Sequence, residues 1–371
     1  MKQDEHFYTL ALTCIPGLGP TTAYNLLTAI GSATEIFQNR TQLPDLFPCA
    51  TEKLIKALNC PEAFLRAEKE LVYAEKNQIQ CLTINDANYP ARLRECSDAP
   101  LALFYRGNAP LNALHIVSIV GTRHATSYGQ DICNSFLNDL SKTLPDVLIV
   151  SGLAYGIDIL AHRAALHNNL STVGVLAHGL DRIYPSVHRN TAIDMMDHGG
   201  LLTEFMSGTN PDRQNFVKRN RIVAGMADAT IVVESAIKGG ALITAELAES
   251  YHRDCFAFPG RCTDTYSVGC NELIRKNRAA ILTSADDFIK AMGWDMHQSP
   301  KENIQRELFP ELTSEEQQVV DILQRNSEGI QINTLVVQAN LPISQLSVIL
   351  FNLEMKGVVK ALAGGLYKVI D

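Results

Sequence analysis

The stretch Ser151-Gly-Leu-Ala-Tyr-Gly-Ile-Asp158 lies between an apolar run, Val147–Val150, and a segment with helical spacing, Ile159–Leu166. A buried strand, a glycine-rich turn and the start of a helix together aim backbone N–H groups at an anion. Two further turns, Gly121-Thr-Arg123 and Lys238-Gly-Gly240, also follow apolar runs. Three such turns, two of them with a cation, predict one binding site for a phosphate-bearing partner.

The composition is that of a globular protein with more than one domain. The chain has 371 residues, of which 46% are hydrophobic and 19% charged, and two or three domains are expected. No apolar run approaches the roughly 20 residues of a membrane span, and the polar N-terminus fits neither a signal peptide nor a transit peptide. The 9 cysteines form no Cys-x-x-Cys pair, which predicts reduced thiols in a cytoplasmic protein without zinc or disulfides. A net charge of −8 restricts any nucleic-acid binding to a local positive pocket.

Apolar runs alternate with helical segments from His115 to about Ala291. This order predicts an α/β domain, residues 76–292, with a mostly parallel sheet and helices on both faces. Ligands of such sheets bind beyond the carboxyl ends of the strands, where the glycine turns fall. The dinucleotide fingerprint Gly-x-Gly-x-x-Gly is absent, and we expect neither a cofactor nor a metal.

Two smaller domains are predicted beside this core. Residues 1–75 are expected to be helical, and Ile15-Pro-Gly-Leu-Gly19 is typical of the turn in a helix-hairpin-helix or sterile-alpha-motif-like domain. Its glycines would let backbone amides approach a nucleic-acid phosphate. The alternative is a small helical packing module, because acidic residues outnumber basic ones in this segment.

After a predicted linker, residues 293–311, the segment 312–371 has the pattern of three helices and a hairpin, which is typical of a winged helix. Such folds usually place their recognition helix in the DNA major groove. Here the expected helix, residues 344–355, contains no Lys or Arg. A winged helix that contacts protein is therefore favoured over one that binds duplex DNA.

Residues 211–221 hold four basic side chains and one acidic one, with an aromatic ring among them. The residues concerned are Arg213, Phe216, Lys218, Arg219 and Arg221. A base could stack on the ring while the cations neutralise phosphates. The alternatives are a solvated helix face and, for Arg219 and Arg221, pairing with carboxylates or helix ends.

Asp158 and His162 are four residues apart on one expected helix, and Ser151 precedes it. These three types could form a hydrolase triad, but the nucleophile-elbow pattern Gly-x-Ser-x-Gly is missing. We expect His162 to be a packed core residue, and no catalytic residue is predicted.

Six segments occur in a fixed order along the chain: Ser151–His162, Gly199–Glu204, Asn215–Gly225, Gly239–Glu246, Phe258–Gly260 and Gly269–Ile274. Together these motifs closely resemble the bacterial DNA-processing protein A family (DprA, also called Smf). The match covers roughly residues 80–292.

The resemblance implies an extended Rossmann-like domain that binds single-stranded DNA in a positive pocket. It also implies homodimers that protect incoming DNA and load the recombinase RecA onto it in natural transformation. Arg123 takes the leading DNA contact, Arg213 matches a basic position three residues before a Phe, and Lys238 matches a basic position before a Gly-Gly turn. The expected contacts are Gly121, Thr122, Arg123, Ser151, Gly152, Gly156, Arg213, Phe216, Lys218, Arg219, Arg221, Lys238, Gly239 and Gly240.

Two other functions stay open. The segment Gly239–Glu246 is similar to the Pro-Gly-Gly-x-Gly-Thr-x-x-Glu motif of nucleotide phosphoribohydrolases, although the Pro and the third Gly are missing. That reading implies an enzyme that binds or hydrolyses a small nucleotide. A winged-helix regulator of duplex DNA is the third hypothesis, and the acidic C-terminal segment weakens it.

Overall fold

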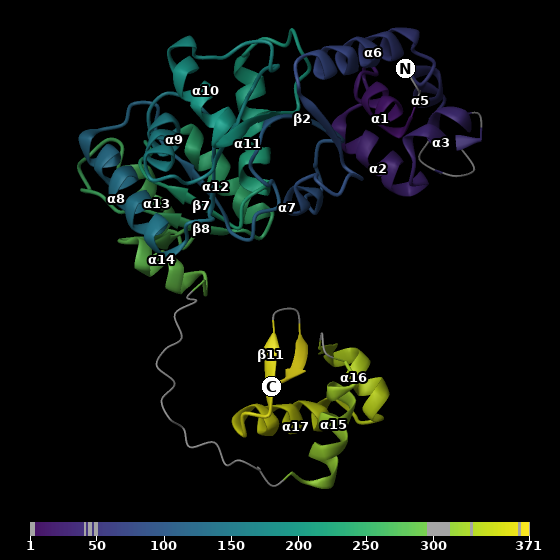
Figure 1. The fold of residues 1–371 in the computed structure, drawn as a ribbon, viewed down its shortest axis with the longest axis vertical. Coiled ribbons are helices and arrows are strands. Elements are labelled where there is room, and N and C mark those ends of the chain that lie inside the picture. Colours follow the sequence, from purple (N-terminus) through teal and green to yellow (C-terminus); the bar gives the residue numbers. More distant parts are fainter. Residues whose placement is uncertain are drawn as a thin grey trace. The chain divides into compact units, whose positions relative to one another are not determined.

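The computed structural model describes residues 4–40, 42–43, 47, 51–294, 312–326, 329–362 and 365–370 (Figure 1). The chain divides into two compact units, Met1–Trp294 and Asp295–Asp371. From position 295 to 311, the predicted linker lies outside the described residues.

The described part of the first unit contains a nine-stranded sheet in the order β1-β2-β6-β5-β4-β3-β7-β8-β9. β1 pairs antiparallel with β2, and β2 with β6, whereas all pairs from β6 to β9 are parallel. This confirms the predicted mostly parallel, extended Rossmann-like fold. The strands are β1 (Gln80–Thr83), β2 (Ala102–Gly107), β3 (Ile116–Val120), β4 (Leu148–Ser151), β5 (Thr172–Val175), β6 (Gly199–Thr203), β7 (Ala229–Val232), β8 (Asp254–Ala257) and β9 (Ala280–Ile281).

Helices cover both faces of the sheet, so the central strands are apolar on both sides. In β3, Val117 and Ile119 pack into a cluster with α8, α9 and α14, whereas Ile116 and Val120 pack into another with α11 and α12. The helices of this region are α7 (Ala91–Arg94), α8 (Ser127–Thr143), α9 (Ile157–His167), α10 (Arg189–Asp197), α11 (Arg213–Gly225), α12 (Gly240–Ser250), α13 (Val268–Arg275) and α14 (Ala285–Ala291).

The N-terminal segment is helical, as predicted, and packs against the sheet domain. Its helices are α1 (Glu5–Thr13), α2 (Pro20–Ile30), α3 (Ala33–Gln38), α5 (Glu52–Ala57) and α6 (Pro61–Lys76). The buried Glu70 carboxylate of α6 accepts hydrogen bonds from the backbone N–H of Ser207 at 2.7 Å and from its hydroxyl at 2.6 Å. Arg66 pairs with Glu70 at 2.8 Å and donates to the Ser207 carbonyl at 2.6 Å. These bonds fix α6 to the loop that follows β6.

The second unit is a winged helix. Its elements are α15 (Ser314–Gln324), β10 (Ile330–Gln331), α16 (Ile332–Ala339), α17 (Ile343–Met355), β11 (Val359–Leu362) and β12 (Leu366–Val369). The strands form a sheet in the order β10-β12-β11. Four residues of α17 face the core: Leu346, Ile349, Leu350 and Leu353.

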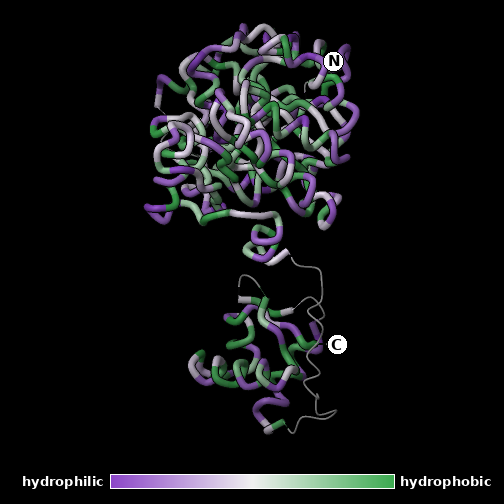
Figure 2. Tube along the Cα trace, turned by 90° about the vertical axis from the view of Figure 1, so that its left-hand side faces the viewer, coloured by the Kyte–Doolittle hydropathy of each residue, from purple (hydrophilic) through white to green (hydrophobic). Residues whose placement is uncertain are grey.

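No single helix among the described residues is both long and apolar enough to cross a membrane. Taken as one segment, α16 and α17 are long and apolar enough for a membrane span, but they are bent by 107° relative to each other. Along both units, hydrophobic and hydrophilic residues alternate over short distances (Figure 2).

Candidate functional site

The order of the parallel strands reverses at β3. β4, the next parallel strand in sequence, lies on one side of β3, and β7 lies on the other. In open α/β sheets, ligands bind in the crevice outside the carboxyl ends of the strands at such a switch point. The three glycine turns follow these three neighbouring strands, with Gly121–Arg123 after β3, Gly152–Gly156 after β4 and Lys238–Gly240 after β7. The topology thus brings together turns that lie far apart in sequence.

The turn after β3 is held from both sides. The Thr122 N–H donates to the Glu234 carbonyl at 2.7 Å, and the Thr122 carbonyl accepts from the Ile157 N–H at 3.1 Å. A Cβ at Gly121 would lie 2.4 Å from the Ile157 side chain. Gly156 has a φ of +77°, and a Cβ there would lie 2.1 Å from the Thr122 carbonyl oxygen. Glycine is therefore required at both positions for β3 and α9 to approach closely.

This rigid turn presents Arg123 to solvent. Its guanidinium carbon lies 5.0 Å from the centroid of the Phe216 ring on α11, within cation–π distance. Arg213 is exposed three residues earlier and therefore lies on the same side of α11 as Phe216. Within the described ranges, neither Arg123 nor Arg213 forms an ion pair with a carboxylate. Both cations are therefore free to bind an anion beside an aromatic ring.

Arg219 is buried and cannot make the DNA contact expected from the sequence. Its side chain is buried, with 4% of its surface exposed, and its guanidinium donates to the carbonyl of Gly152 at 2.5 Å and to that of Val175. Burial lowers the pKa of Arg219 to about 10, and Asp158 opposes that shift. A Cβ at Gly152 would lie 2.4 Å from this guanidinium. Arg219 therefore supports the glycine turn after β4 from inside and does not face a ligand.

Arg221 is also buried, and its guanidinium binds the Glu204 carboxylate and the Asp98 carbonyl. Burial raises the pKa of Glu204, while the charge of Arg221 acts in the opposite direction. The expectation that Arg221 contacts DNA is corrected in the same way. Pairing with a carboxylate, the alternative considered for Arg221, is what the structure contains.

The three residues of the conceivable triad do not form one. The Ser151 hydroxyl is buried and donates to the Ile119 carbonyl at 2.6 Å, so it does not line the site either. His162 is fully buried, and its Nδ1 lies 2.7 Å from the Thr172 hydroxyl. Burial lowers the pKa of His162 to about 3. The prediction of a packed core histidine is confirmed.

The other predicted contacts are two exposed lysines and the two glycines before α12. Lys218 is exposed on α11 and lowers the pKa of Glu204, so it lies on the Glu204 side of that helix. Lys238 is exposed on the turn between β7 and α12. Gly239 caps α12, where a Cβ would lie 2.3 Å from the Ser235 hydroxyl, whereas Gly240 has open space around it. Contacts that join Lys218 or Lys238 to Arg123 are not found among the described residues.

Two exposed rings near the site were not singled out from the sequence. Tyr184 is 46% exposed, and its ring centroid lies 6.1 Å from that of Phe216. Tyr155 is 47% exposed within the turn after β4 and packs edge-on against His188, with 5.1 Å between the ring centroids. A large ring inside a glycine turn was a visible signal for Tyr155. Nothing in the sequence spacing points to Tyr184.

The carboxylate considered for nucleotide hydrolysis is engaged elsewhere. Glu246 lies in the C-terminal half of α12 and pairs with Arg278 at 3.0 Å. In the part of the chain that the structure describes, no group of three or more His, Cys, Asp or Glu side chains could hold a metal ion. The site therefore consists of exposed cations, aromatic rings and backbone turns.

Comparison with known proteins agrees with this geometry. The family model described as DNA recombination-mediator protein A matches residues 80–293. The chain belongs to this family. A second model, the DprA winged helix domain, matches residues 306–365.

Members of the family have similar sequences and structures. A DprA relative from Mycobacterium tuberculosis is 42% identical over 205 residues, which are 55% of this chain and 52% of that protein. The match thus spans about half the length of that relative. The crystal structure of DNA processing protein A from Streptococcus pneumoniae aligns with a TM-score of 0.57 and 32% identity over 73% of this chain and 97% of the other. The family protein of Helicobacter pylori, whose structure is described as revealing a single-stranded DNA binding mode, aligns with a TM-score of 0.53 and 29% identity over 59% of this chain and 98% of the other.

Proposed function

We propose that the chain binds single-stranded DNA at the switch point between β4, β3 and β7. The observation that carries this proposal is the position of Arg123 on a turn held at both ends, unpaired and directly over Phe216. Single-stranded DNA offers phosphates for the cations and bases for the rings, which is the combination that this surface can bind. The single-stranded DNA binding mode described for the Helicobacter pylori relative supports the choice of ligand.

In this proposal Arg123, Arg213, Lys218 and Lys238 neutralise phosphates, and the N–H groups of the glycine turns add hydrogen bonds. A base stacks on Phe216, with Tyr184 beside it. Such stacking contributes about 1–3 kcal/mol per base and tolerates every base, since each has a π face. The affinity should fall steeply with salt, because counterions are released when phosphates are neutralised.

We further propose that the protein acts without catalysis, in the cytoplasm, as a homodimer that protects incoming strands and loads RecA onto them in natural transformation. Membership of the recombination-mediator family supports this role. Ser151 and His162 are buried and Glu246 pairs with Arg278, so these three side chains are not arranged for the hydrolysis considered from the sequence. A dimer would hold two segments of one strand and so raise the effective concentration of the second contact.

The test is fluorescence anisotropy of labelled oligo-dT and of the matching duplex between about 50 and 200 mM salt. We expect a strong preference for the single strand and a steep loss of affinity with salt. Arg123→Ala should weaken binding at least about tenfold, because it removes a charge-assisted contact worth about 1.5–3 kcal/mol.

Lys142→Ala is the charge-matched control, since Lys142 is exposed near the end of α8, at the opposite edge of the sheet. If Arg123→Ala and Lys142→Ala bind oligo-dT equally well, the site assignment is wrong. Loading is tested separately by RecA filament growth on DNA coated with single-strand binding protein. Growth that is equal with and without this chain would contradict the mediator role alone.

A further inference from the structure

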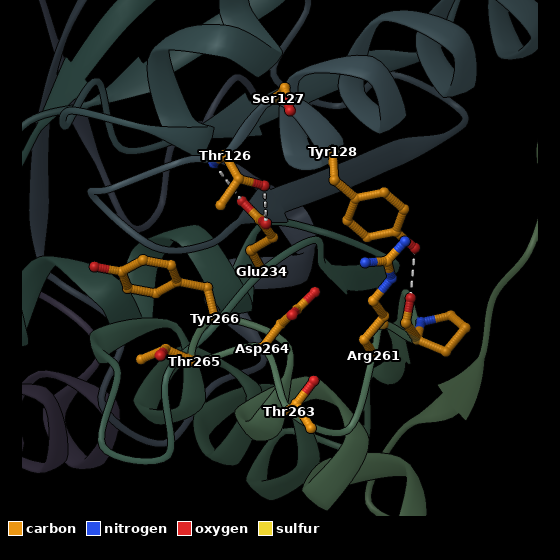
Figure 3. Close-up of a pocket in the computed structure, with 11 residues that line it drawn as sticks. Thr126, Ser127, Tyr128, Glu234, Arg261, Thr263, Asp264, Thr265 and Tyr266 are labelled. Atoms are coloured by element: carbon orange, nitrogen blue, oxygen red, sulfur yellow. Dashed lines mark hydrogen bonds between the residues drawn. The ribbon is translucent and has the colours of Figure 1, made fainter.

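A cavity of about 970 Å³ opens beside the switch-point site, and the proposed function does not use it. Its walls come from the first turn of α8, from Glu234 after β7 and from the loop after β8, residues 259–266 (Figure 3). All three lie at the carboxyl edge of the sheet, as does the turn that carries Arg123. The volume is in the range of known ligand pockets and exceeds what a single base needs.

Glu234 lines the cavity and also bonds to the Arg123 turn. The Glu234 carbonyl accepts from Thr122, while its side chain accepts from the Thr126 N–H at 3.0 Å and the Thr126 hydroxyl at 2.5 Å. His124, the residue after Arg123, places its ring 6.1 Å from that of Tyr266 in a stacked arrangement. A strand bound at Arg123 and continuing past His124 would therefore meet the cavity next.

The cavity is formed before any ligand arrives, because its loop is fixed at both ends. The Tyr128 hydroxyl donates to the Pro259 carbonyl at 2.5 Å, which joins the loop to α8. The Asn271 amide donates to the Gly260 carbonyl at 2.9 Å and accepts from the Gly260 N–H at 3.2 Å. At the far end, the Ser235 N–H donates to the Tyr266 carbonyl at 2.6 Å.

Two opposite charges line the cavity without neutralising one another. Arg261 and Asp264 are both exposed, and neither side chain forms an ion pair or hydrogen bond with another described residue. Asp264 points its carboxylate toward the middle of the cavity, between Tyr266 on one side and Arg261 with Tyr128 on the other (Figure 3). Glu234, by contrast, is buried, and both of its oxygens are satisfied by Thr126.

This lining does not suit a phosphate, since a phosphate would lie against the Asp264 carboxylate. It suits a planar group that carries both donors and acceptors and can lie on an aromatic ring. The Watson–Crick edge of an unpaired base has these properties. Carboxylates accept hydrogen bonds from the amino group of cytosine, and arginine donates to base acceptors such as guanine O6 and N7.

We propose that this cavity binds a base of the same single strand and favours bases with an exocyclic amino group over thymine. Asp264 accepts from the amino group, Arg261 donates to a ring nitrogen or carbonyl, and Tyr266 contacts the face. Thymine presents a carbonyl where the others present the amino group, so its oxygen would be opposed to the Asp264 carboxylate. This inference rests on the proposed function and adds base preference to a site otherwise indifferent to sequence.

The experiment compares anisotropy of labelled oligo-dC and oligo-dT, each of about 20 nucleotides, at mildly alkaline pH where cytosine runs stay unpaired. We expect the wild-type protein to bind oligo-dC about fivefold or more tightly, the discrimination of one good side-chain–base pair. Asp264→Asn should tighten oligo-dT binding and bring the two affinities within about twofold, because an amide can donate to the thymine carbonyl. Asp254→Asn should keep the wild-type preference, since Asp254 is an exposed carboxylate at the amino end of β8.

The outcomes separate this inference from the proposed function. Equal binding of oligo-dC and oligo-dT by the wild-type protein, with both weakened by Arg123→Ala, would refute the base pocket and leave the DNA site standing. An equal loss of preference in Asp264→Asn and Asp254→Asn would also refute it, because net charge would then explain the effect. If neither oligonucleotide binds, both proposals fail.

Discussion

Two helices of the same length, 13 residues each, differ in the chemistry of their exposed surfaces. α11 of the sheet domain carries four cations, two of which face inward to carbonyls and a carboxylate while two face solvent. α17 occupies the recognition-helix position of the winged helix and contains neither Lys nor Arg. Its exposed side chains include Val348, Phe351 and Met355, with 59%, 61% and 74% of their surfaces exposed. The place where a fold usually binds DNA is therefore not the place where this chain carries the chemistry to do so.

The largest expected effect concerns the inner face of α11. Arg219→Met leaves the carbonyls of Gly152 and Val175 without a donor and the buried Asp158 without an opposite charge. We expect a loss of about 3–5 kcal/mol in the free energy of unfolding. Urea unfolding followed by Trp294 fluorescence measures this loss of stability. Trp294 is the single tryptophan of the chain, and its ring centroid lies 4.2 Å from that of His115 in the first unit.

Arg213→Met is the matched variant on the outer face and should change the stability by less than about 0.5 kcal/mol. It should nevertheless weaken binding of single-stranded DNA. Equal stability losses in the two variants would show that α11 does not have one structural and one binding face.

The next effect tests the support beneath Arg123. Gly156→Ala places a methyl group against the Thr122 carbonyl at a positive φ and should cost at least about 2 kcal/mol of stability and weaken DNA binding. Gly208→Ala is the comparison, because Gly208 also has a positive φ, +81°, but no atom lies within 4 Å of the added Cβ. It should cost about 1 kcal/mol and leave DNA binding intact. If both variants bind DNA equally well, the close approach at Gly156 is not what positions Arg123.

Acid should destabilise the sheet domain through His162. Its pKa is about 3 in the fold and about 6.5 when unfolded, so below about pH 6.5 the unfolded chain binds more protons. Above about pH 6.5, protonation of His162 does not lower the free energy of unfolding. Between that pH and about pH 3, the free energy of unfolding falls by about 1.4 kcal/mol for each pH unit of acidification. Unfolding followed at several pH values by Trp294 fluorescence reports the slope. His162→Gln should reduce it, whereas His167→Gln, on the exposed end of α9, should not.

The smallest effect is expected in the winged helix. Replacing both lysines of its hairpin, Lys360→Ala and Lys368→Ala, should change the affinity for single-stranded DNA by less than about twofold in anisotropy measurements. A drop as large as that of Arg123→Ala would overturn the comparison between α11 and α17. The winged helix would then be a second DNA-binding surface.

The sheet and its glycine turns could be predicted because buried parallel strands leave continuous apolar runs, such as Ile116–Val120 and Leu148–Ser151. The sequence could not predict which face of α11 is exposed. Its sequence places Arg219 and Arg221 among buried positions, so no apolar stripe distinguishes the inner side from the outer one. The groups that accept hydrogen bonds from the two buried arginines, such as Gly152 and Glu204, come from distant parts of the chain.

The aromatic neighbour of Phe216 could not be predicted from the sequence either. Tyr184 lies beside Phe216 because the loop after β5 folds over α11, and no spacing along one segment encodes such a contact. The motif Phe258–Gly260 runs into the loop at residues 259–266, but no sequence pattern marks Arg261 and Asp264, because only the fold places them opposite α8. Local patterns therefore predicted the backbone turns, whereas tertiary contacts determined which side chains face the ligand.

The contact between Arg123 and Phe216 has a consequence for selectivity among polyanions. The guanidinium rests on the face of the ring, and a base that stacks there must displace it. In the proposed complex, the displaced guanidinium binds the incoming phosphate, so base stacking and charge neutralisation occur together. A polyanion without bases, such as polyphosphate or a sulfated glycan, can still bind the N–H groups of Arg123 but gains no stacking on the ring. If the proposed site is correct, such a polyanion should therefore bind more weakly than single-stranded DNA of the same charge.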